Sequence, residues 1–408
     1  MFFLSLSLIL ILGVIAGYFL NKIKLPSLIG YLLIGMLLGY FGLIDKNVNE
    51  ISSELRKIAL IIILIKAGLT LNLDDLKKVG RPAILMSFVP AIFEMITFGL
   101  LGPLFFNLTY NESFIMGACI GAVSPAVVVP RMVKMIEDNR GVKKGIPQMI
   151  LAGSSMDDVV MIVFYSAFMT IEQGNSVGFM TYLNIPLSIL TGIIVGLIIG
   201  LLLVFLFKKV HVRDSIKLTL ILGLSFGLVY LESYIGNYFG YSSLLSAITL
   251  GIVVLAKKKE VATRLSLKCS KLWVVAEIVL FTLVGASIKI DYFATYLLPA
   301  LGIIWCALFV RLIGVLISLI KTNLDFKERA FVSIAYIPKA TVQAAIGGGL
   351  LDLGTSLQNT NIINAGVIVL SVSVVAILFT APIGAFLTDI SSKRLISLDY
   401  VQVKGENK

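Results

Sequence analysis

Long apolar segments follow one another along the chain, and short polar stretches separate them. Each segment is about 20 residues long, the length that a helix needs to cross roughly 30 Å of hydrocarbon. The segments are too long for barrel strands and do not alternate between apolar and polar positions, so they predict helices. We therefore expect an all-α membrane protein. Its thirteen transmembrane helices are predicted at about 1–21, 27–44, 55–72, 82–105, 113–135, 145–171, 179–207, 214–232, 241–256, 270–289, 293–320, 328–351 and 362–388.

The composition agrees with a membrane location. Of the 408 residues, 58% are hydrophobic and 14% are charged, whereas about 25% are charged in a soluble domain. The mean hydropathy is +1.00. So few polar residues cannot cover the surface of a soluble fold of this length. The N-terminus is apolar from Phe2 and lacks a charged leading region, so we expect the first segment to stay as a helix and not to be removed as a signal peptide.

The formal net charge is +11, and the basic residues are concentrated in alternate loops. Lys and Arg gather in the loops after predicted helices 1, 3, 5, 7, 9 and 11, while the loops after helices 4, 6, 8 and 12 carry none. This alternation is typical of the positive-inside rule and not of a nucleic-acid-binding protein. It predicts an N-terminus outside and a cytoplasmic C-terminus. Because the loops are short, we expect a single membrane domain over 1–388 and a short cytoplasmic tail over 389–408.

The residues for metal or nucleophilic chemistry are scarce. Cys119, Cys269 and Cys306 form no close pairs, and the single histidine, His211, lies in a basic loop. The sequence therefore predicts no disulfide framework, no structural metal and no Ser/His triad. We expect a protein that is not an enzyme and that needs no cofactor.

Two of the predicted helices contain prolines that would interrupt them at mid-membrane depth. The stretch 121–130 contains Pro125 and Pro130, and the stretch 335–349 contains Pro338 before a run of three glycines. Proline removes a backbone donor and clashes with the preceding turn. An interrupted helix is tolerated in a membrane only where it is buried in protein or lines a cavity. We therefore expect both stretches to be broken helices at a functional site.

The two broken helices lie seven helices apart, and so do two buried charges, Glu94 and Arg311. Because seven is odd, the second unit would be inserted upside down relative to the first. We predict two inverted six-helix repeats, at about 1–171 and 214–388, joined by a linker helix at about 179–207. Inverted repeats with broken helices near the midplane are a recurring plan of secondary transporters.

Five ionisable residues lie well inside the apolar segments, where each costs on the order of 3 kcal/mol or more. They are Glu94, Asp157, Asp158, Arg311 and Lys339. The adjacent acids Asp157 and Asp158 cannot both be ionised cheaply in a low dielectric, so one of them is suited to holding a proton. Carboxylate oxygen is also a suitable ligand for a hard cation such as Na⁺.

Neighbouring residues on a helix point about 100° apart, so the two aspartates should have different roles. Ser154 lies four residues before Asp158, on the same helix face, and its hydroxyl could complete a cation shell. Lys339 lies at the second proline break, where it would offset a helix C-terminus and could pair with Asp157. For Glu94 and Arg311 we expect a structural ion pair.

The motifs GSSMDDVVMIV, VSPAVVVP and IPKATVQAAIG, taken together, resemble the monovalent cation:proton antiporter superfamily, and most closely its NHA-type sodium/proton antiporters. The resemblance spans nearly the whole chain. It implies a core domain in which two broken helices cross, a separate dimerisation domain, a homodimer and elevator-type movement. It also implies that Asp158 binds the cation and the proton, with Asp157 as support and Ser154 in the cation site. Many electrogenic members carry Lys where this chain has Arg311, which leaves the stoichiometry open.

We therefore predict exchange of Na⁺ or Li⁺ for H⁺ at Asp158, with Asp157, Ser154 and backbone carbonyls near Val123 and Ser124 as further ligands. The expected location is a bacterial plasma membrane. Exchange of K⁺ for H⁺ on the same fold is the nearest alternative, since the residues do not fix the cavity size. A cation channel or an organic-anion symporter is more distant, and a membrane enzyme more distant still.

Overall fold

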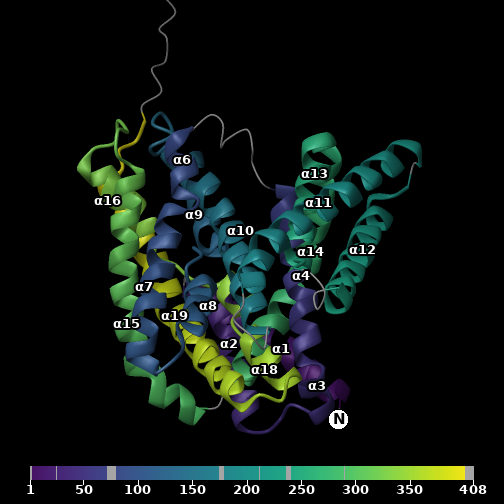
Figure 1. The fold of residues 1–408 in the computed structure, drawn as a ribbon. Helices are drawn as coiled ribbons and strands as arrows, with labels where there is room; N and C mark the ends of the chain where they lie inside the picture. The colour runs from purple at the N-terminus through teal and green to yellow at the C-terminus, as the bar shows by residue number, and fades with distance from the viewer. Residues whose placement is uncertain are drawn as a thin grey trace, which may run out of the picture.

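The structure is a computed structural model, and it describes residues 2–23, 25–70, 80–173, 179–210, 212–235, 240–288 and 290–399. The described part of the chain is helical apart from turns and one isolated bridge (Figure 1). The helices are α1 (Phe2–Lys22), α2 (Ser27–Tyr40), α3 (Lys46–Glu50), α4 (Ser52–Thr70), α6 (Arg81–Met86), α7 (Val89–Phe106), α8 (Tyr110–Ile120), α9 (Pro125–Glu137), α10 (Ile146–Gln173), α11 (Phe179–Lys209), α12 (Asp214–Ile235), α13 (Ser243–Lys257), α14 (Lys259–Ala286), α15 (Ile290–Ser318), α16 (Phe326–Ala335), α17 (Thr341–Ile346), α18 (Gly349–Ser356) and α19 (Thr360–Leu395).

Every predicted segment coincides with a helix or with an interrupted run of helices. Within the described residues, nine segments are long and apolar enough to cross a membrane, and α2 and α13 are shorter apolar helices. The number of thirteen crossings stays a prediction. His211 and residues 400–408 of the expected tail lie outside the described residues.

The helices differ from the predicted segments in three places. The segment 82–105 coincides with one candidate span, Arg81–Phe106, but the helix is interrupted inside it, because α6 stops at Met86 and α7 starts at Val89. Pro90, at the start of α7, lacks a backbone N–H and restricts the residue before it, which explains the interruption. The helix α19 runs to Leu395, beyond the predicted end of the last segment at residue 388, and a cytoplasmic tail from residue 389 stays a prediction. The helix α14 begins eleven residues before the predicted position, in a charged stretch that is continuous with the candidate span Lys259–Ala286.

The helices pack in two groups (Figure 1). The first group comprises α1–α4 and α11–α14, and the second comprises α6–α10 and α15–α19. Contacts between the groups run chiefly from α10 to α11 and α13, and from α17 to α4 and α14. Both broken helices and the double aspartate therefore belong to the second group and lie close to the first.

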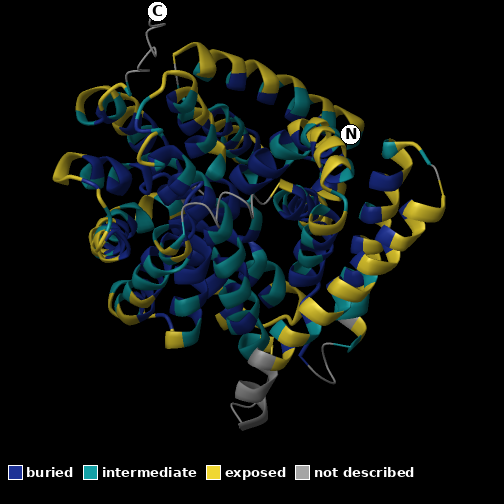
Figure 2. Ribbon diagram, turned by 90° about the horizontal axis from the view of Figure 1, so that it is seen from above, coloured by how far each residue is buried: buried dark blue, intermediate teal, exposed yellow. Residues whose placement is uncertain are grey.

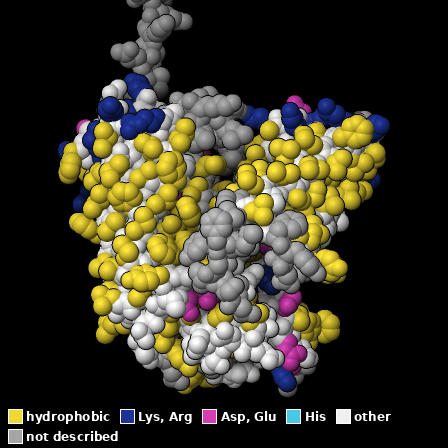
Figure 3. Space-filling model, in the orientation of Figure 1, with side chains coloured by type: hydrophobic (Ala, Val, Ile, Leu, Met, Phe, Trp, Pro, Cys, Tyr) yellow, Lys and Arg dark blue, Asp and Glu magenta, His cyan; other side chains and the backbone are white. Residues whose placement is uncertain are grey.

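Apolar side chains fill the interior and also cover much of the outside. Seen from above, buried positions face inward and exposed positions follow the outer faces of the peripheral helices (Figure 2). Large exposed hydrophobic residues occur along α1, α11, α12 and α15, and in the view of Figure 3 the side is largely hydrophobic while Lys and Arg gather at the upper end. An apolar outer belt of this kind is expected where lipid is the solvent.

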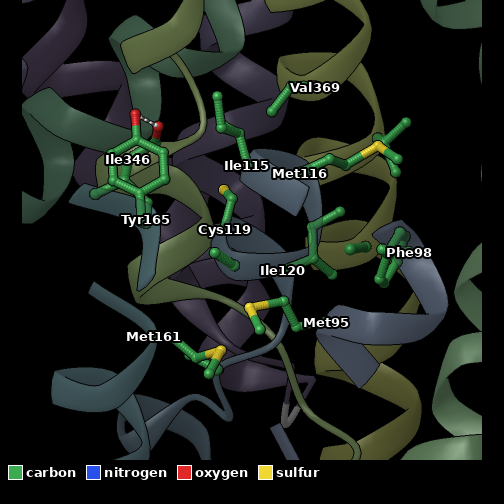
Figure 4. Close-up of a cluster of buried hydrophobic side chains, with 14 of the residues drawn as sticks. Met95, Phe98, Ile115, Met116, Cys119, Ile120, Met161, Tyr165, Ile346 and Val369 are labelled. Atoms are coloured by element: carbon green, nitrogen blue, oxygen red, sulfur yellow. Dashed lines mark hydrogen bonds between the residues drawn. The ribbon is translucent and has the colours of Figure 1, made fainter. Parts of the chain in front are cut away.

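Inside the second group, an apolar cluster surrounds the end of α8. Figure 4 shows Met95 of α7, Ile120 of α8 and Met161 of α10 packed together there. All three are nearly fully buried. The cluster packs the end of α8, just before the first break, against α7 and α10.

The loop between α9 and α10, residues 138–145, is held by hydrogen bonds to the segment after α19 and by an ion pair with α16. The segment after α19 runs back along it: Asp399 N–H donates to Asn139 O at 2.8 Å, and Lys143 N–H donates to Asp399 Oδ2 at 3.0 Å. On the other side, Lys144 Nζ lies 2.7 Å from Glu328 Oε2 at the start of α16. The hydrogen bond to Glu328 raises the pKa of Lys144 above its ordinary value. These ties connect both broken helices to α10 at one end of the second group.

Candidate functional site

The two broken helices are built alike. Each begins with a capping box, Thr109 with Glu112 before α8 and Asp325 with Glu328 before α16. In a capping box the two side chains satisfy free N–H groups at the helix start. Each first half ends after ten or eleven residues, and four or five residues without helical structure follow, 121–124 and 336–340. This similarity supports the predicted inverted repeat, which stays a prediction.

The prolines do not contribute equally to the breaks. Pro125 is the first residue of α9, where a missing N–H costs nothing because that group has no helical partner. Pro338 lies within the second break. Pro130 lies inside α9 and not at the break, so its assignment as a break residue is wrong. Its ring removes one helical hydrogen bond but leaves the helix continuous.

Hydrogen bonds join the two breaks directly. Ser124 N–H donates to Pro338 O at 2.8 Å. Gln343 Nε2 donates to Ile120 O at 3.1 Å and to Ala122 O at 2.8 Å, and so satisfies two carbonyls that the end of α8 leaves free. The sequence analysis gave Gln343 no role. A buried amide in an otherwise apolar helix, five residues after a proline break, is the signal that could have identified it.

Four of the five buried charges form one network. Arg311 Nη1 donates to Glu94 Oε2 at 2.5 Å, and Arg311 Nη2 donates to Asp157 Oδ2 at 2.8 Å. Lys339 Nζ donates to Glu94 Oε2 at 2.5 Å. The four side chains have no exposed surface. Arg311 also donates to Gly121 O in the first break.

The structure therefore contains the predicted Glu94–Arg311 ion pair, but the predicted pairing of Lys339 with Asp157 is wrong. The planar fork of Arg311 reaches both acids at once, through a different terminal nitrogen for each. Lys339 instead shares the same oxygen of Glu94. The network links α7, α10 and α15 to the second break.

Asp157 and Asp158 lie in different surroundings, as expected for neighbours on a helix. Asp157 is fully buried, and its Oδ2 accepts hydrogen bonds from Arg311 and from Val123 N–H at 2.9 Å. Asp158 has 9% of its surface exposed, and its Oδ1 has no hydrogen-bond partner. Asp157 is therefore held in place, while Asp158 has an oxygen available for a ligand.

Further buried oxygen atoms near the first break are also without protein partners. They are Asp157 Oδ1 and Ser124 Oγ. Ser154 is fully buried, and its Oγ lies 3.3 Å from Leu151 O in its own helix, to which it donates. Because the Val123 N–H contacts Asp157, Ser124 next to it lies beside the aspartate pair. Buried oxygens without partners need an explanation, and a small hard cation takes such ligands. A role for the Val123 carbonyl stays a prediction.

Comparisons with known proteins show which family the chain resembles. A family model described as "Sodium/hydrogen exchanger, transmembrane" matches residues 7–387. The chain is 32% identical over 415 residues to human sodium/hydrogen exchanger 9B2, covering 97% of this chain and 75% of that protein. It is 28% identical over 402 residues to human sodium/hydrogen exchanger 9B1, covering 95% and 77%. Among solved structures, the sodium proton antiporter MjNhaP1 of Methanocaldococcus jannaschii has a TM-score of 0.82 at 22% identity, over 96% of this chain and 97% of that one, and so shares the fold.

Proposed function

Because this chain belongs to the sodium/hydrogen exchanger family and is thus an integral membrane cation/proton antiporter, we propose that it exchanges Na⁺ or Li⁺ for H⁺ at Asp158. The observation that carries the proposal is the free Oδ1 of Asp158 beside an Asp157 that is already fixed by Arg311 and Val123. In this proposal Asp158 takes either a proton or a cation. In the same proposal, Asp157, Ser124 and Ser154 complete the cation shell.

The charges of the site provide a reason for exchange. Three buried acids, Glu94, Asp157 and Asp158, face two buried bases, Arg311 and Lys339. With all five ionised, one negative charge remains, and either one proton or one monovalent cation neutralises it. An uncompensated charge in a low dielectric is costly. The loaded site can therefore cross the membrane more readily than the empty one, which couples the two ions.

The two helix groups suggest how the site moves. We propose that the second group is the moving core of an elevator mechanism and that the first group is the domain that forms a homodimer. The N-terminus is proposed to lie outside and the C-terminus in the cytoplasm, since Lys and Arg gather at one end of the molecule (Figure 3). The matched exchangers above are human proteins, and a bacterial plasma membrane stays a prediction.

The test uses the purified protein in liposomes that contain a pH-sensitive dye. We expect Na⁺ or Li⁺ added outside to drive protons out through the wild-type protein, and K⁺ to do so much less. Asp158→Asn should lose the cation-driven flux, because an amide can neither release a proton nor bind a cation as a carboxylate does. Asp389→Asn is the matched control, because Asp389 is a half-exposed acid of α19 outside the site.

Full flux in Asp158→Asn would remove Asp158 from the mechanism. A wild-type response to K⁺ that exceeds the response to Na⁺ and Li⁺ would instead establish exchange of K⁺. Repeating the assay with the membrane potential clamped and then free measures the stoichiometry, for which the charge count above gives one proton for each cation.

A further inference from the structure

A cavity of about 470 Å³ lies between the two helix groups. Its walls come from the start of α4, the second half of α10, the facing ends of α12 and α13, and α17 with α18. Two of these elements, the start of α4 and α18, lie toward the lower end in Figure 1, opposite the end at which Lys and Arg gather in Figure 3. Under the proposed orientation the lower end is the outer end. Along α10 the cavity reaches inward as far as Tyr165, two turns from Asp158.

An ion pair joins the two groups at this cavity. Arg56 of α4 lies in the first group and Asp352 of α18 in the second, and Arg56 Nη2 lies 2.6 Å from Asp352 Oδ1. Only 7% of the Arg56 side chain and 21% of the Asp352 side chain are exposed. The ion pairs of Arg311 and Lys339 described above, by contrast, all lie within the second group. Any movement of one group past the other must break or displace the Arg56–Asp352 pair.

The glycines of the second broken helix provide the surface on which this contact rests. A Cβ atom at Gly348 would lie 2.0 Å from Arg56 Nη1, and a Cβ atom at Gly349 would lie 2.1 Å from the Tyr165 hydroxyl. The Tyr165 hydroxyl donates to Ile346 O at 3.0 Å, as Figure 4 shows. Together Arg56 and Tyr165 cover the gap between α17 and α18. Larger residues at these two positions would push both side chains away.

We propose that the Arg56–Asp352 pair, seated on Gly348, is an outer latch between the two groups, and that it must open for the site to reach the outside. The proposal deepens the exchange function and rests on it. It assigns a conformational role to Arg56, Asp352 and the glycine run, all of which lie away from the cation site. The pair lies in the wall of the cavity and joins the two groups there, so opening it lets the groups separate along α10 toward Asp158.

The first experiment links the two groups covalently. Arg56→Cys with Asp352→Cys, in a Cys306→Ala background that removes the exposed cysteine, is treated with a short bifunctional thiosulfonate and assayed in liposomes before and after reductant. We expect the link to abolish exchange and the reductant to restore it. The control pair is Arg131→Cys with Asp389→Cys, since these residues form an ion pair inside the second group; linking it should leave exchange unchanged. Unchanged exchange in the linked 56/352 protein would overturn the latch.

The second experiment needs no transport, so it decides the question even if the double variant is inactive or the proposed function is wrong. Ile162→Cys places a thiol one turn inward of Ser166 on the cavity-facing side of α10, at a position that is 1% exposed. A membrane-impermeant maleimide is then added from the outside. We expect Arg56→Gln to speed the labelling by about tenfold, because removing one partner of a buried pair strongly disfavours the closed arrangement. Arg131→Gln should leave the rate unchanged, and equal rates in the two variants would overturn the latch.

Discussion

At the scale of single residues, one carboxylate forms ion pairs with two basic side chains. Glu94 Oε2 accepts from both Arg311 and Lys339, and all three side chains are fully buried. The ion pair of Lys46 with Glu50 is the opposite case, because both side chains are largely exposed. Exposed pairs contribute little to stability, whereas breaking a buried pair leaves an uncompensated charge in a low dielectric.

Glu94→Gln should therefore lower the stability of the folded protein by about 3 kcal/mol or more, since two buried cations lose their shared acid. The measurement is the thermal unfolding midpoint in detergent, followed by the loss of the monodisperse peak. Glu50→Gln is the control and should leave the midpoint unchanged. Equal midpoints for the two variants would mean that other groups balance the charges of Arg311 and Lys339 when Glu94 is neutral.

The sequence predicts which residues are unusual but not all of their partners. The lone positions of Glu94 and Arg311 in apolar segments were enough to predict their pairing. The position of Lys339 at a break could not show that its ammonium reaches Glu94 and not Asp157. That choice depends on how α7, α10 and α15 converge, which no local pattern encodes.

At the scale of elements, the breaks were predictable and their details were not. Proline in an apolar segment predicted both breaks. Pro130 nevertheless lies inside α9, because a helix that starts at Pro125 tolerates one missing hydrogen bond five residues later. The bonds from Gln343 to the end of α8 join residues more than 220 positions apart, beyond the reach of any periodicity. The role of the glycine run also appears only when Arg56 and Tyr165 are in place.

Gly348→Ala tests that role. The added methyl group would overlap Arg56 Nη1, so we expect the outer labelling of Ile162→Cys to rise as it does with Arg56→Gln. Gly223→Ala is the matched control, because a Cβ atom on that residue of α12 would meet nothing within 4 Å. Removal of a helical glycine there should stabilise the protein slightly, by roughly 0.5–1 kcal/mol, without a change in labelling. An unchanged labelling rate in Gly348→Ala would show that Arg56 does not depend on this glycine.

At the scale of the whole molecule, the helices form two groups. The sequence shows only one uninterrupted succession of apolar segments, with no sign of this division. The positions of the helices follow from hydropathy, but their division follows from contacts between distant segments, such as α4 with α13 and α14. Arg56 shows what hydropathy alone cannot predict. It lies near the end of a predicted span, where a long basic side chain ordinarily reaches the interface, and only the fold shows that it meets Asp352.

If one site serves both ions, proton and cation must compete for it. We therefore expect the apparent KM for Na⁺ to rise by up to about tenfold for each unit of falling pH, while the maximal rate at saturating Na⁺ changes little. Cation titrations of proteoliposomes at several pH values measure this directly. An apparent KM that is independent of pH would mean that proton and cation bind at separate places.

The short segment after α19 has a practical consequence for handling the protein. Through Asp399 and Leu398 it pairs with the α9–α10 loop, and that loop joins one broken helix to the helix of the two aspartates. A truncation or a reporter fused at residue 395 would remove this pairing and the hydrogen bond from Arg140 to Ile396 O, while the contact of Lys144 with Glu328 would remain. Affinity tags and fluorescent reporters therefore belong after residue 399, and a shortened version designed to remove the tail should keep everything up to that point.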